Sequence, residues 1–264
     1  MRPNRLRELI ENGTFSLGIH VHSPWPSVVE MVGHSGQFDY VEYVASYAPH
    51  DLHTLDNIGR AIDLFDDFSG MIKVEKEISG WLASRAMGAG IQNLLFSDIR
   101  TVADAEEAVR AVRAETPDRD GVHGVNMRRY VRFGADAGTE DFLTSLDDAV
   151  VALMIEKKEA VEDLEAILGV PGVDMVQFGP ADYSLSIGKP RLYQDAEVLE
   201  AELHVIKTAL GLGIQPRVEL ARPEGFERYL ELGVRHFCVG TDVSILMNWF
   251  RDEGSRMREI LESA

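Results

Sequence analysis

VVALMIEKKEAVEDLEAILGVPGVDMVQFGPADYSLSIG, residues 150–188, is the stretch that decides the fold of this chain. Its first six residues are an apolar, largely β-branched run, typical of a strand buried on both faces of a parallel sheet. Apolar residues at helical spacing follow, until Gly169, Pro171 and Gly172 interrupt them. A second apolar run, residues 173–178, ends in Gly-Pro-Ala-Asp. The stretch therefore predicts a strand, a helix, a second strand and a loop.

The same alternation continues over the rest of the chain. We expect strands at 16–21, 40–45, 71–75, 91–97, 150–155, 173–178, 214–220 and 236–240. Helical patterns lie between them, at 27–32, 52–65, 78–87, 101–112, 196–212 and 243–261, and Thr101 with Asp104 resembles a capping box. Eight strands alternating with helices predict an α/β fold, a single (β/α)8 TIM barrel spanning residues 1–264.

Two carboxylates follow consecutive strands of this predicted barrel. Glu156 comes directly after residues 150–155, and Asp182 comes shortly after residues 173–178. The carboxyl ends of parallel strands meet at the rim where such barrels carry out their chemistry. Two oxygen ligands on one rim suit Mg²⁺ or Mn²⁺ better than Zn²⁺. The alternative is that Glu156 begins a helix and Asp182 caps a turn, but their corresponding positions favour a metal site.

Composition restricts the partners of the protein. The chain is 45% hydrophobic and carries a net charge of −18, which argues against nucleic acid or an anionic membrane as a partner. Its one cysteine, Cys238, lies in an apolar run and is expected to be a buried thiol. We recognise no signal peptide and no apolar run of about 20 residues. A soluble, cytoplasmic protein is expected.

A long loop concentrates positive charge in this acidic protein. Residues 123–138 contain Arg128, Arg129 and Arg132 beside two aromatic residues. Arginine binds carboxylates and phosphates through a planar fork, so one hypothesis is a lid or anion clamp over the barrel mouth. The alternative is a solvated loop whose arginines pair with surface acids.

Histidines gather after the first two strands. His20 and His22 end the first strand, and His50 and His53 follow the second. One catalytic imidazole is plausible there, and His22 and His50 are the candidates. No His-x-x-x-His or His/Cys cluster with zinc spacing supports a histidine-rich metal site.

Three segments carry a family resemblance: residues 87–113, residues 154–188 and residues 229–246. They resemble the HpcH/HpaI aldolase/citrate lyase family, whose best-known members cleave 4-hydroxy-2-oxo acids into pyruvate and an aldehyde. The resemblance implies a (β/α)8 barrel and a divalent metal (Mg²⁺, Mn²⁺ or Co²⁺) held by Glu156 and Asp182. It implies that the backbone of Gly179, Pro180 and Ala181 helps to hold the substrate carboxylate.

The resemblance also implies an assembly. In the family, the last helix packs on a neighbouring subunit, so a homo-oligomer, a trimer or a hexamer, is expected. The small-molecule partners that it implies are a 2-oxo acid and an aldehyde.

This chain departs from the usual family pattern at three positions. The Asp-Gly-Glu-His sequence that supplies the family's acid/base dyad is Val-Ala-Ser-Tyr here, so Tyr47 occupies the position of the base. An unperturbed tyrosine has a pKa near ~10, which makes it a hydrogen-bond donor and a poor base. Lys73 stands where an arginine usually stabilises the enolate, and Met154 stands where a glutamine usually binds the substrate.

The residues support a metal-dependent aldolase with atypical acid/base groups. We expect a 2-oxo acid to form a pyruvate-type enolate, with Lys73 balancing its charge and Tyr47, with His22 or His50, moving the proton. Three alternatives remain: another enolate-forming lyase, such as a decarboxylase or a citrate-type condensing enzyme; a coenzyme A thioester lyase; and a non-catalytic binding protein on a decayed aldolase scaffold.

Overall fold

Eight parallel strands close into a barrel in chain order, with β1 hydrogen-bonded to β8. The structure, a computed structural model, describes residues 2–191 and 193–264. The strands are β1 (Ser16–Val21), β2 (Tyr40–Val44), β3 (Ser69–Val74), β4 (Asn93–Ile99), β5 (Val151–Ile155), β6 (Met175–Phe178), β7 (Gln215–Leu220) and β8 (His236–Thr241). The predicted (β/α)8 TIM barrel is confirmed, and each predicted strand is present with its ends moved by at most two residues.

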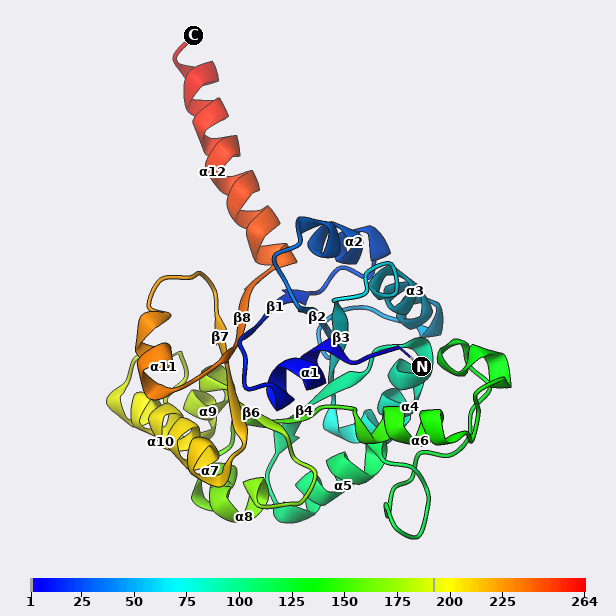
Figure 1. Ribbon diagram of the computed structural model, residues 1–264. Helices are drawn as coiled ribbons and strands as arrows, with labels where there is room; N and C mark the ends of the chain where they lie inside the picture. Colours follow the sequence, from blue (N-terminus) through cyan, green and yellow to red (C-terminus); the bar gives the residue numbers. More distant parts are fainter. Residues whose placement is uncertain (1, 192) are drawn as a thin grey trace.

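Helices surround this barrel (Figure 1). They are α2 (Pro26–Ser35), α3 (Leu52–Ile62), α4 (Ser79–Ala89), α5 (Val102–Val112), α6 (Glu140–Asp147), α7 (Lys158–Glu162), α8 (Leu164–Leu168), α9 (Pro180–Ser186), α10 (Ala196–Leu212) and α11 (Glu227–Leu232). Neighbouring helices pack side by side, as α2 does on α3 and α3 on α4. The predicted capping box at Thr101 and Asp104 begins α5.

Apolar side chains form a large core and a smaller one between strands and helices, the smaller one around Val218 and Phe237, and a further core inside the barrel. The large core includes Ile72, Leu94 and Val151 from the strands and Leu55 and Leu82 from the helices. The inner core contains Leu6, Tyr40, Met71, Leu95, Val150, Ala152, Met154 and Met175. Gly18 makes room for the Tyr40 ring, because a Cβ at this glycine would lie 2.3 Å from the ring. A TIM barrel is therefore a filled core, and its chemistry is confined to one end.

The helix α1 (Arg5–Glu11), which the sequence reading did not include, lies across the amino-terminal end of the barrel (Figure 1). Its Leu6 is fully buried in the inner core. The Asn4 side chain before it donates hydrogen bonds to Asn93 Oδ1 at 2.7 Å and to the Asp148 carbonyl at 2.8 Å. This end of the barrel is thus plugged by α1, which leaves the carboxyl end as the open one.

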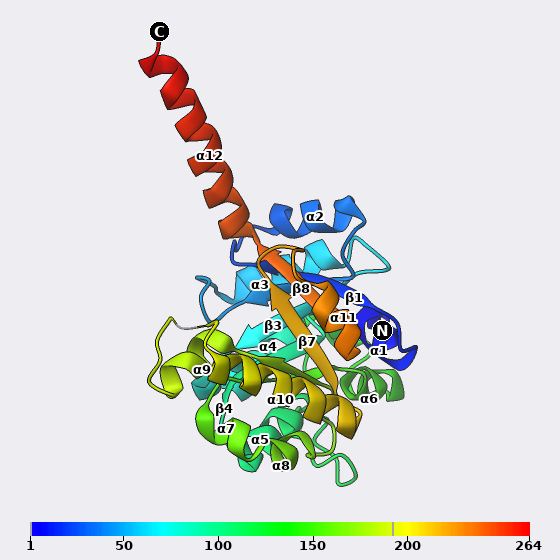
Figure 2. The same cartoon turned by 90° about the vertical axis from the view of Figure 1, so that its left-hand side faces the viewer.

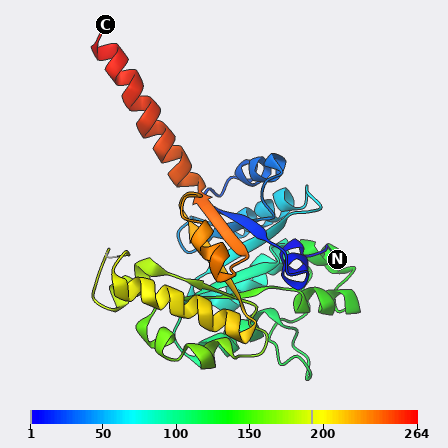
Figure 3. The same cartoon turned by 60° about the vertical axis from the view of Figure 1, so that its left-hand side comes forward.

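The last helix, α12 (Asp242–Glu262), extends away from the barrel as a straight arm (Figures 2 and 3). Its exposed large apolar side chains include Trp249 and Phe250, at 63% and 59% exposure. Among the described helices, none combines the length and the apolar character that crossing a membrane requires.

Candidate active site

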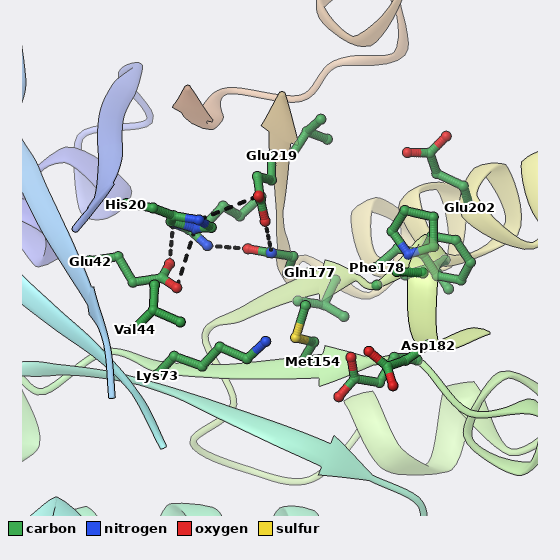
Figure 4. Close-up of a pocket in the computed structure, with 18 of the residues that line it drawn as sticks. His20, Glu42, Val44, Lys73, Met154, Gln177, Phe178, Asp182, Glu202 and Glu219 are labelled. Carbon is green, nitrogen blue, oxygen red and sulfur yellow. Dashed lines mark hydrogen bonds and ion pairs between the residues drawn. The ribbon is translucent and has the colours of Figure 1, made fainter. Parts of the chain in front are cut away.

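A cavity of about 310 Å³ lies at the carboxyl end of the barrel. Residues from the ends of seven strands and the segments after them line it, among them His20, His22, Glu42, Tyr47, Lys73, Met154, Glu156, Gln177, Gly179, Pro180, Ala181, Asp182, Arg217, Glu219 and Thr241. Figure 4 shows its two sides: His20, Glu42 and Glu219 on one side and Asp182 on the other, with Lys73 and Met154 between them. Most of the residues selected from the sequence therefore meet in a single cavity.

The two predicted metal carboxylates come from adjacent strands. β5 pairs in parallel with β6, with Ile155 opposite Phe178. Glu156 directly follows β5, and Asp182 lies in the first turn of α9, whose N1 position is Pro180. Both carboxylates line the same cavity. The strand–helix–strand stretch thus delivers the pair to one rim, in the way its sequence suggested.

The surroundings of Glu156 disfavour an uncompensated negative charge. The residue is 4% exposed, and burial raises the pKa of its carboxyl, with a further contribution from the Asp182 carboxylate. The backbone N–H of Asp98 donates to Glu156 Oε1 at 2.9 Å, and Asp98 reaches this position through a left-handed backbone with φ 57°. Lys157 contacts Asp182 at 3.5 Å and Asp98 at 3.2 Å.

Gly179 keeps the space beside Glu156 open. A Cβ on this glycine would lie 2.7 Å from Glu156 Oε2 and 3.2 Å from Met154 Cε. The donor set is two carboxylates around an open space, one of them with a pKa raised by burial and by the other carboxylate. A hard divalent cation requires oxygen ligands with room for further oxygens from water or substrate. The residues present therefore fit a Mg²⁺-like ion.

Lys73 and two of the proposed proton-transfer groups lie together in the cavity. Burial lowers the pKa of Lys73, but attraction to Tyr47, Glu156 and Glu42 outweighs it, so that the pKa is raised and the ammonium persists at neutral pH. Its Nζ donates to Tyr47 Oη at 3.4 Å. The rings of His22 and Tyr47 are 5.9 Å apart, and burial lowers the pKa of His22. A neutral imidazole beside a phenol can accept a proton at neutral pH.

The structure places His50, the second candidate base, outside the cavity lining. Its Nδ1 lies 3.2 Å from the Ala48 carbonyl, and its ring packs edge-on against Tyr43. The first turn of α3 follows directly, with Asp51 as its N-cap. The turn after β2 therefore directs Tyr47, and not His50, into the cavity.

Arg128 and Arg129 also lie elsewhere, which corrects the expected position of an anion clamp over the barrel mouth. Arg128 pairs with Asp56 at 3.0 Å, and Arg129 forms an ion pair with Asp63 and donates to the Ala89 carbonyl. Asp56 lies in α3 and Asp63 is its C-cap, so the arginines attach their loop, part of the green segment at the flank of Figure 1, to the outer helices. Arg128 and Arg129 thus form ion pairs with acidic side chains, as expected under the alternative hypothesis of a loop whose arginines pair with surface acids.

Polar side chains inside the barrel form a second cluster that sequence reasoning missed. We call it the interior network, and it comprises His20, Glu42, Gln177, Arg217 and Glu219. A signal for it was present: charged or amide residues interrupt otherwise apolar strands at positions that face inward, and buried polar groups need partners. His20, at the end of the first predicted strand, belongs to this network, whereas the predicted bases are His22 and His50.

Three buried side chains, His20, Glu42 and Cys238, bring their ligand atoms within 4.8 Å of one another. Arg217 already forms an ion pair with Glu42, and both of these side chains are fully buried. A divalent cation placed there would face this guanidinium at short range and low dielectric. The grouping therefore suits a metal less well than Glu156 and Asp182.

Comparisons with known proteins agree with this geometry. A family model described as HpcH/HpaI aldolase/citrate lyase matches residues 54–248. The chain is 31% identical to a hydroxypyruvate/pyruvate aldolase of Pseudomonas aeruginosa over 97% of this chain and 93% of the relative. It is 30% identical to a pyruvate aldolase of Rhizobium etli over 92% and 93%. The crystal structure of a protein of the same family from Burkholderia cenocepacia superposes with a TM-score of 0.87 at 28% identity, over 97% of this chain and 100% of that one.

Proposed function

Because this chain belongs to the HpcH/HpaI aldolase/citrate lyase family, we propose that it is a divalent-metal-dependent aldolase that acts on a 2-oxo acid through a pyruvate-type enolate. The observation that carries the proposal is the convergence of Glu156, Asp182 and Lys73 on one cavity at the carboxyl end of the barrel. The related aldolases with the names given above support pyruvate or hydroxypyruvate as the nucleophilic half of the substrate.

Glu156 and Asp182 would hold the metal ion, for which Mg²⁺ or Mn²⁺ is the best chemical match and Co²⁺ is an option. When bound, such an ion supplies a Lewis acid for the ketone and carboxylate of a 2-oxo acid. The first-turn N–H groups after Gly179 and Pro180 lack partners within α9, so they are available to the substrate carboxylate. Lys73 contributes a positive charge near the ketone oxygen, where negative charge develops in the enolate.

Tyr47 and His22 would handle the proton of the substrate hydroxyl. The Tyr47 oxygen accepts a hydrogen bond from Lys73, so its own proton is free to point at substrate. In the cleavage direction the C4 hydroxyl loses its proton to the neutral His22 imidazole, and the C3–C4 bond breaks. The bonding electrons then form the enolate, and the aldehyde leaves. The protonated imidazole of His22 then returns its proton to the enolate at C3, which gives pyruvate and restores the neutral His22.

An aldolase reaction is preferred over the other lyase reactions that the same metal site could support. The comparisons do not favour a citrate-type reaction over the aldolase one. A non-catalytic binding protein would have no need of the convergent acids, ammonium and imidazole. The homo-oligomer expected from the sequence stays a prediction.

Replacement of the two metal carboxylates tests the proposal. We expect Glu156→Ala and Asp182→Ala each to lower kcat/KM for pyruvate addition to an aldehyde by about 10³-fold or more, since the Lewis acid is lost. Isothermal titration with Mn²⁺ should show the same loss of metal affinity, and circular dichroism should show an unchanged fold. Glu165→Ala, an exposed acid on α8, is the matched control and should keep both properties. Retention of metal affinity and activity by the double variant would refute the proposal.

A further inference from the structure

The interior network is a closed chain of contacts that crosses the barrel. His20 Nε2 lies 3.3 Å from Glu42 Oε1, and His20 Nδ1 lies 3.3 Å from Glu219 Oε1. Gln177 Nε2 donates to Glu219 Oε2 at 3.0 Å, and Gln177 Oε1 accepts from Arg217. Arg217 completes the chain through its ion pair with Glu42. Figure 4 shows these contacts as dashed lines on the side of the cavity that lies away from Asp182.

The position of His20 requires a particular charge state. Both ring nitrogens lie 3.3 Å from carboxylate oxygens, so an imidazolium forms an ion pair with each carboxylate, which a neutral imidazole cannot do. Burial lowers the pKa of His20, but attraction to the Glu42 carboxylate and the contribution of Cys238 outweigh it, so the pKa is raised well above its ordinary value. The network then contains two cations and two anions, and it is electrically balanced.

Glu219 is the open end of this balanced network. The other four side chains are at most 8% exposed, whereas the Glu219 side chain is 39% exposed and lines the cavity. Two partners, His20 and Gln177, each bind one of its oxygens and hold the carboxylate in one orientation. A carboxylate oxygen accepts more than one hydrogen bond, so each oxygen can still accept from a ligand.

Glu219 stands on the opposite wall of the cavity from the metal carboxylates. In Figure 4, Glu219 lies at the upper centre and Asp182 at the lower right, with Met154 between them. The next step rests on the proposed function. A 2-oxo acid held near Glu156 and Asp182 would extend its C4 end across this space. The group that meets that end of the substrate is therefore a fixed acceptor with a negative charge.

From this arrangement we propose that Glu219 forms the subsite for the aldehyde half of the substrate and selects aldehydes that carry hydroxyl groups. Hydroxyl groups donate hydrogen bonds to the carboxylate. An alkyl aldehyde leaves it unpaired, and an aldehyde with its own carboxylate is repelled. Glu202, which lines the same cavity, adds to the repulsion of anionic aldehydes.

Three aldehydes with pyruvate as the common nucleophile test the proposal: glyceraldehyde, propanal and succinic semialdehyde. Wild-type protein should prefer glyceraldehyde to each of the other two by about tenfold or more in kcat/KM, because a site built to bind hydroxyls discriminates strongly against analogues without them. Glu219→Gln removes the charge and should reduce the preference over succinic semialdehyde by about tenfold. Glu219→Asp keeps the charge but retracts it, so it should still reject the semialdehyde while KM for glyceraldehyde rises. Unchanged selectivity in both variants would overturn the proposal.

The exchange of the pyruvate methyl protons in D₂O, followed by NMR, separates this proposal from the function on which it rests. Exchange needs the enolate machinery and no aldehyde. If wild-type protein with Mn²⁺ or Mg²⁺ shows no exchange, the proposed function fails, and the subsite with it. If exchange falls in Glu219→Gln along with aldol addition, Glu219 serves enolate formation, and the subsite proposal is overturned. Glu224→Gln, which removes an exposed acid after β7, is the matched control and should match wild-type protein in both assays.

Discussion

Buried histidines in this barrel differ in whether an opposite charge reaches them. His20 lies between two carboxylates, as described above. His236 is also fully buried, but its Nδ1 faces only the Ser16 hydroxyl at 2.9 Å. Burial lowers the pKa of His236 to about 4, and the positive charges of Arg235 and Arg217 add to the effect. His236 is therefore neutral in the folded protein over the range in which an unfolded histidine becomes charged.

This difference predicts a pH dependence of stability. The unfolded protein binds a proton at His236 below a pH of about 6.5, whereas the folded protein does not bind it until the pH approaches about 4. The free energy of unfolding therefore decreases as the pH falls from about 6.5 toward about 4, because protonation of His236 favours the unfolded protein. The full decrease is on the order of 3 kcal/mol. Between pH 7 and pH 4.5, the free energy of unfolding measured with urea should decrease less for His236→Asn than for wild-type protein. His204→Asn, at an exposed position on α10, is the control, and a decrease equal to that of wild-type protein in both variants would contradict the prediction.

Residue patterns predicted one half of the cavity and missed the other. Glu156 and Asp182 were recognisable because each lies within a few residues of the end of an apolar strand. Glu42, Arg217 and Glu219 lie inside strand patterns, and the contacts Glu42–Arg217 and His20–Glu219 join strands that are far apart in the sequence. No local pattern states that two such residues will face each other across a barrel. The loop arginines were placed wrongly for the same reason, because their acidic partners in α3 and at its C-cap lie 72 and 66 residues away in the sequence.

At the scale of elements, the strand runs were predictable because strands buried on both faces are apolar and short. The helix α1 was missed because its sequence, RLRELIE, is short and highly charged. What stabilises α1 is the floor of the barrel, formed by residues far away in the sequence such as Met71, Leu95 and Val150. An isolated helix of this length is not stable in water, so it depends on tertiary packing.

The plug formed by α1 should be energetically important. Leu6 is fully buried in the inner core, so Leu6→Ala would leave a cavity at the amino-terminal end of the barrel. We expect a loss of about 2–5 kcal/mol in the free energy of unfolding, measured by chemical denaturation. Glu11→Ala, on the exposed end of the same helix, should change stability by no more than about 0.5 kcal/mol. Equal effects of the two substitutions would show that α1 does not close the barrel.

At the scale of the whole molecule, α12 carries an apolar surface with no partner among the described residues. Leu246, Phe250, Met257 and Leu261 repeat at helical spacing and are each at least 50% exposed. Trp249 lies beside this stripe at 63% exposure. Large contiguous apolar patches on soluble proteins mark interaction sites. A second copy of the chain is the occupant that the family resemblance of the sequence predicts.

The resulting prediction concerns the mass of the protein in solution. Wild-type protein should form a homo-oligomer, because association would bury the exposed apolar side chains of α12 against another copy. Trp249→Glu combined with Phe250→Glu places two charges in that stripe, which would be costly to bury, and should shift the mass measured by light scattering toward the monomer. Ser255→Glu adds a charge on the opposite face of α12 and should leave the mass unchanged. A wild-type monomer, or an oligomer that survives the double substitution, would mean that the arm serves another purpose, since the barrel closes without it.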